Sequence, residues 1–74
     1  MWHTGSIMVK KEVFHYWVKS YDEPSRYGIK NGRISKLLLT SGGVTAVSYD
    51  RGWETRPGTE NAELALAILL KEYN

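Results

Sequence analysis

A Pro57-Gly58 pair divides the chain into two parts with different hydrophobic patterns. Before it, β-branched and aromatic residues alternate with polar ones, which favours strands. After it, apolar residues recur at helical spacing. Because proline and glycine both interrupt regular structure, the chain is predicted to form a sheet followed by one helix. Its 74 residues leave room for a single domain, residues 1–74.

Four strands are predicted in the first part, and they span residues 6–9, 12–21, 34–41 and 44–49. Lys10-Lys11 and Gly42-Gly43 supply two-residue turns, and glycine tolerates the positive φ that tight hairpin turns require. In the second strand, Phe14, Tyr16 and Val18 share one face, whereas Trp17 and Lys19 lie on the other. Since burying Lys19 would be costly, the Phe14 face is predicted to face the core.

The predicted helix begins after an N-cap at Thr59 and ends near Tyr73. Its apolar stripe is Ala62, Ala65, Leu66, Leu69 and Tyr73, widened by Leu70, and Leu64 and Ile68 lie off it. Packing this helix on the sheet covers both apolar surfaces. The predicted fold is therefore α+β, a four-stranded antiparallel meander with one C-terminal helix on one face. The predicted core includes Phe14, Tyr16, Val18, Leu37, Leu39, Val47, Leu66 and Leu69.

The tripeptide Ser-Tyr-Asp occurs twice, at residues 20–22 and 48–50, and each copy ends a predicted strand. In a meander, the second and fourth strands run in the same direction, so these ends share one edge of the sheet. The candidate binding site is the loop cluster at that edge: Tyr21, Asp22, Arg26, Tyr27, Tyr49, Asp50, Arg51 and Trp53. Arg26 or Arg51 is expected to lie close to Asp22 or Asp50.

Two other interpretations of these residues stay open. The loop aromatics can instead fill the open end of a small core, with the aspartates bonded to loop amides or arginines. The binding surface can also be the sheet face that the helix leaves uncovered, where Trp17 and Lys19 lie.

The sequence contains no constellation typical of catalysis, cofactor binding or metal binding. His3 and His15 are the only histidines and there is no cysteine. Asp22 and Asp50 are the one possible carboxylate pair, but aspartates at strand ends usually cap turns or pair with arginines. We therefore expect a protein that is not an enzyme and has no small-molecule substrate.

Several sequence blocks resemble a family of small proteins of unknown function from Gram-positive bacteria, their phages and conjugative elements. The blocks are residues 16–19 (Tyr-Trp-Val-Lys), 21–25 (Tyr-Asp-Glu-Pro-Ser), 32–37 (Gly-Arg-Ile-Ser-Lys-Leu) and 49–53 (Tyr-Asp-Arg-Gly-Trp). The resemblance covers nearly the whole chain except Phe14-His15 and the hairpin at 40–45. It implies no activity, but it suggests an accessory role on mobile DNA.

Two classes of function remain. The first is a protein-interaction module that binds a protein partner or a second copy of itself. The second is a nucleic-acid binder, in which aromatic side chains stack on bases and basic ones meet phosphates. The net charge of +2 is small, although residues 1–36 hold seven basic and three acidic side chains (+4) and residues 37–74 three and five (−2).

Two features of the sequence bear on localisation. The lack of cysteine favours the reducing cytoplasm. No apolar run approaches the roughly 18 residues of a membrane span, so a membrane partner is not expected.

Overall fold

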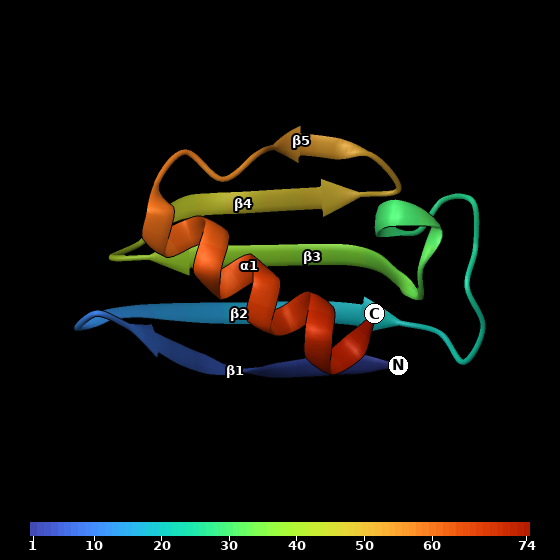
Figure 1. Ribbon diagram of the computed structural model, residues 1–74, viewed down its shortest axis with the longest axis horizontal. Coiled ribbons are helices and arrows are strands. Elements are labelled where there is room, and N and C mark those ends of the chain that lie inside the picture. The colour runs from blue at the N-terminus through green and yellow to red at the C-terminus, as the bar shows by residue number, and fades with distance from the viewer.

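Five strands form one antiparallel sheet in the order in which they occur along the chain (Figure 1). They are β1 (Trp2–Val9), β2 (Glu12–Ser20), β3 (Ile34–Ser41), β4 (Val44–Asp50) and β5 (Trp53–Thr55). A single α-helix, α1 (Glu60–Tyr73), crosses one face of the sheet diagonally and contacts β1 to β4 (Figure 1). A 3₁₀ helix (Ile29–Asn31) lies in the connection between β2 and β3. The computed structural model describes all 74 residues.

Both predicted two-residue turns are present. Lys10 and Lys11 join β1 to β2 with φ values of 48° and 71°, and Gly42 and Gly43 join β3 to β4 with φ values of 57° and 79°. Positive φ at both central residues gives the turn a twist that matches the flanking strands. The glycines adopt it without a steric penalty, whereas the two lysines do so at some cost.

The predicted number of strands was wrong, because the sheet has five and not four. β5 contains only three residues and follows a tight connection in which Arg51 has a φ of 58°. A segment this short leaves too little alternation for sequence analysis to detect. β1 is also longer than predicted: it begins at Trp2 and pairs with β2 along its whole length, although Gly5 and the polar residues beside it weaken the strand pattern.

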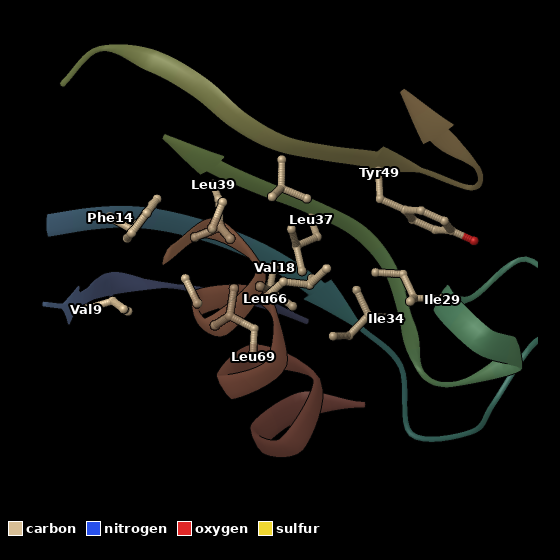
Figure 2. Close-up of a cluster of buried hydrophobic side chains, with 13 residues drawn as sticks. Val9, Phe14, Val18, Ile29, Ile34, Leu37, Leu39, Tyr49, Leu66 and Leu69 are labelled. Carbon is tan, nitrogen blue, oxygen red and sulfur yellow. The ribbon is translucent and has the colours of Figure 1, made fainter. Parts of the chain in front are cut away.

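The core lies between α1 and the sheet and contains 13 buried hydrophobic residues (Figure 2). Seven of the eight predicted core residues are among them, and Phe14, Val18, Leu39 and Val47 are completely buried. Tyr16 is only half-buried, because it lies near the end of α1, where the helix no longer covers the sheet fully. Its hydroxyl is 3.1 Å from that of Tyr73. This hydrogen bond, together with burial, raises the pKa of Tyr73 to about 12.

Both ends of α1 are bonded to their surroundings. The Thr59 hydroxyl accepts a hydrogen bond from the Ala62 amide at 3.1 Å, which confirms the predicted N-cap. At the other end, the Asn74 side chain accepts from the Ile34 amide at 3.0 Å and donates to the Ile29 carbonyl at 3.1 Å. Asn74 thus connects the helix to the β2–β3 loop. Neither helix of the structure has the length and hydropathy needed to cross a membrane.

Candidate functional site

The two Ser-Tyr-Asp segments lie at the same end of the sheet. The arrowheads of β2 and β4 point the same way in Figure 1, as the predicted meander requires. Two backbone hydrogen bonds connect this region to the beginning of β3 and the residue before it: the Tyr21 amide donates to the Arg33 carbonyl at 3.0 Å, and the Arg51 amide, directly after the second segment, donates to the Ser35 carbonyl at 2.9 Å. The residues after β2 and β4 are therefore both bonded to the same part of the chain.

Tyr49 and Trp53 complete the core at this end. The Tyr49 side chain is 7% exposed, and its ring meets the half-buried Trp53 edge to face, with 5.1 Å between the ring centroids. The Tyr49 hydroxyl points towards the β2–β3 connection, where it donates to the Tyr27 carbonyl at 2.7 Å (Figure 2). These two aromatics thus support the β2–β3 connection from the core side. Little of the Tyr49 surface is exposed for contact with a ligand.

Tyr27, in contrast, is half exposed and is surrounded by arginines. The guanidinium of Arg26 lies 5.0 Å from the ring centroid of Tyr27, and that of Arg51 lies 6.0 Å from it. Both distances fall within the range of cation–π attraction. Arg26 also donates to the Tyr27 hydroxyl at 3.0 Å. The end of the sheet therefore presents a cationic aromatic surface.

No arginine forms an ion pair with Asp22 or Asp50. Asp50 pairs with Lys36 at 3.8 Å, and Asp22 takes part in no ion pair. Lys36 on β3 lies directly opposite Asp50 on β4, so the two side chains are neighbours on the same face of the sheet. The structure contains no group of three or more histidine or carboxylate side chains that could hold a metal ion.

The face of the sheet opposite α1 carries exposed apolar side chains, and we call it the open face. Trp2 is 54% exposed, Met8 68%, Val13 42% and Trp17 41%. Trp17 is flanked by Thr4 on β1 and by the half-buried Leu38 on β3. A hollow of about 350 Å³ runs over this surface, and its lining includes Trp2, Trp17, Lys36, Leu38, Ser48, Asp50 and Glu54.

Charged groups on the open face are separated by sign. Lys19 on β2 and Lys36 on β3 are basic, whereas Asp50 on β4 and Glu54 on β5 are acidic. The Lys19 ammonium lies over the rings of Trp2 and Tyr21, at 5.8 Å and 5.5 Å from their centroids. A hydrogen bond from Lys19 lowers the pKa of the exposed Tyr21 hydroxyl. Glu54 accepts a hydrogen bond from the Ser48 hydroxyl at 2.6 Å.

Alternation in the sequence correctly predicts Trp17 and Lys19 on this face, but Trp2, Leu38 and Glu54 were missed. Trp2 was missed because the first strand was predicted to begin at Ser6. Leu38 stands in the continuous apolar run Leu37 to Leu39, which hides the alternation, and Glu54 belongs to the strand that was not predicted. The alternation of Lys36, Leu38 and Thr40 with buried residues is the signal that could have extended the face to β3.

Fold and site together define a small α+β domain with one covered and one open sheet face. The chain belongs to a family described as a domain of unknown function, DUF7678, whose model matches residues 1–74. No curated protein and no solved structure matches the chain.

Proposed function

We propose that the protein is a non-enzymatic, cytoplasmic interaction module that binds another protein through the open face. The observation that carries the proposal is the exposure of Trp2, Trp17, Met8 and Val13 on a face that no element of the chain covers. Trp17 with Leu38 and Met8 with Val13 form two apolar patches on this face, and the Ser6–His15 pair lies between them. Exposed apolar patches with polar groups around them usually mark a protein interface. Tryptophan is also enriched among the residues that dominate binding energy.

The charge of the open face favours a protein over a nucleic acid as its partner. Lys19 and Lys36 are balanced by Asp50 and Glu54, so the face carries as many carboxylates as ammonium groups. A surface that binds nucleic acid carries an excess of positive charge to neutralise phosphates. A protein surface with apolar and mixed charged groups complements the open face better.

The proposal is tested by recovering binding partners from the native host with tagged variants, after nuclease treatment. Trp17→Ser is expected to lose the recovered protein, because it removes the large apolar group at the centre of the face. Leu64→Ser is the matched control, since Leu64 is also 41% exposed but lies on α1. The recovered protein is then purified, and its direct binding is expected to weaken at least about tenfold with Trp17→Ser. Equal binding by both variants would refute the proposal.

A nucleic-acid role is the second candidate, and it rests on the loop end of the sheet. Arg26, Lys30, Arg33 and Arg51 are exposed there, and none of them pairs with a carboxylate. With two guanidinium groups near the exposed Tyr27 ring, this surface could stack a base and contact phosphates. Such an activity would fit the accessory role on mobile elements of Gram-positive bacteria that the sequence resemblance suggests.

If this candidate is right, a single-stranded oligonucleotide binds more weakly as the salt concentration rises. The slope of the logarithm of the binding constant against the logarithm of the salt concentration is then expected to be shallower in the double variant Arg26→Ser/Arg51→Ser. Fluorescence anisotropy at 50 and 200 mM salt measures that slope. Binding that does not respond to salt or to the double substitution would exclude it.

A further inference from the structure

We propose that the partner of the open face is a second copy of this chain. Two open faces pack on each other around a two-fold axis that runs along β3. The inference rests on the proposed function, because it identifies the partner of the same face. Most soluble oligomers are symmetric, and a two-fold interface requires a surface that complements itself.

The open face has the dimensions that a stable dimer needs. The molecule measures 33 × 20 × 18 Å, and the sheet lies in the plane of the two longer dimensions (Figure 1). The two longer dimensions enclose at most about 660 Å², which falls at the lower end of the roughly 600–1,000 Å² that each partner contributes to a standard protein interface. The apolar residues Trp17 and Leu38 occupy neighbouring positions on β2 and β3, near the middle of the face, where the residues that dominate binding are usually found.

The charges of the face complement each other in one orientation. Lys19, Lys36 and Asp50 stand side by side in one cross-strand row on β2, β3 and β4. Rotation by 180° about an axis along β3 places β2 of one copy over β4 of the other at the same height. Lys19 of each copy then faces Asp50 of the other, which gives two equivalent ion pairs. Lys36 of each copy meets its own equivalent at the axis, beside the Asp50 carboxylate that already pairs with it.

The charge of Lys19 is not neutralised by a carboxylate of the chain, although its ammonium group contacts Tyr21. It lies directly opposite Lys36 in the sheet, and like charges in that position repel. Lys36 has the Asp50 carboxylate 3.8 Å away, whereas Lys19 has no carboxylate partner within the chain. An acidic group from the second copy would neutralise the pair of ammonium groups more completely.

The alternative two-fold axis, across the strands, gives no such match. It would set the charged row of one copy over the opposite end of the other sheet, where Met8 and Val13 form a cross-strand pair. The Lys19 ammonium group would then be buried against apolar groups without a carboxylate partner, at high cost. With the axis along β3, the strands of the two sheets stay roughly aligned, as in common sheet-on-sheet packing.

The hollow on the open face also fits this arrangement. The same rotation brings Trp17 of one copy over Ser48 of the other, because Trp17, Leu38 and Ser48 form the next cross-strand row. The hollow of about 350 Å³ includes Leu38, Ser48 and Glu54 in its lining, so it offers space for an indole ring. Leu38 of each copy meets its own equivalent at the axis.

Sedimentation velocity of the purified chain tests the inference. The wild type is expected to sediment with twice the 8.5 kDa mass of the chain at micromolar concentration. Lys19→Glu and Asp50→Lys, each alone, are expected to raise the dimer Kd at least about tenfold, because each places like charges together. An equimolar mixture of the two variants is expected to regain the dimer, since every new charge then meets its opposite. Lys71→Glu on the exposed surface of α1 is the control and should leave the dimer unchanged.

Circular dichroism confirms that each variant is folded. A wild type that stays monomeric would overturn the dimer, while loss of a different protein partner in Trp17→Ser would still support the proposed function. A dimer that resists both charge reversals would show that another surface forms it. Failure of the mixture to recover would exclude the axis along β3.

Discussion

Leu69→Ala is expected to lower the free energy of unfolding by about 2–5 kcal/mol. The Leu69 side chain is 1% exposed and lies on the side of α1 that packs on the sheet (Figure 2). Truncation removes apolar contacts and leaves a cavity that neighbouring side chains fill only partly. A domain of this size has a free energy of unfolding of only a few kcal/mol, so the loss would be a large share of the total. Chemical denaturation measures it.

Leu64→Ala is the matched control for this substitution. Leu64 is the same residue type on the same helix, but its side chain is 41% exposed. The expected change in unfolding free energy is within about 0.5–1 kcal/mol. A loss below about 0.5 kcal/mol for Leu69→Ala, or equal losses for both variants, would mean that α1 packs through a different face.

Gly28→Ala is expected to cost about 1–3 kcal/mol, although alanine can adopt the backbone angles found there. Gly28 is buried, with φ of −77° and ψ of 158°. A Cβ at this position would meet the carbonyl oxygen of Gly32, and it would lie 2.8 Å from the carbonyl carbon of Gly32 and 3.2 Å from the Ile34 carbonyl oxygen. These are backbone atoms, so the whole β2–β3 connection must shift.

Gly58→Ala is the control for the loop substitution. No atom lies within 4 Å of a Cβ added at Gly58, and its φ is outside the left-handed region. The expected change is within about 0.5 kcal/mol. Thermal or chemical denaturation of both variants measures the difference, and an undisturbed Gly28→Ala protein would contradict the tight packing of the loop on Gly32.

The regular part of the fold could be predicted from the sequence. Period-two alternation in β2, the Gly42-Gly43 turn and the helical stripe after Pro57 each have a short-range physical cause, so the meander and the helix face were confirmed. β5 and the 3₁₀ helix were missed because three-residue elements depend on tertiary contacts. Ile29 is completely buried, yet it stands alone between Gly28 and Lys30 in the sequence and shows no periodicity.

The loop cluster was placed correctly at one end of the sheet, but its internal contacts could not be predicted. Which cation reaches Asp50 depends on cross-strand register, and the register brings Lys36 to it before either arginine. The contrast between buried Tyr49 and exposed Tyr27 depends on how the β2–β3 loop folds back over the core. The position of Trp17 and Lys19 on the open face could be predicted from alternation alone, because successive residues of a strand point to opposite faces of the sheet.

Site-specific photo-crosslinking in the native host tests most directly whether the open face is the interaction surface. A photoreactive amino acid is placed at position 17 on the open face, 64 on α1 or 27 at the loop end. We expect a protein adduct from position 17, with the chain itself as the partner if the dimer forms, and none from position 64. Protein adducts from position 64 or 27 and none from position 17 would contradict it.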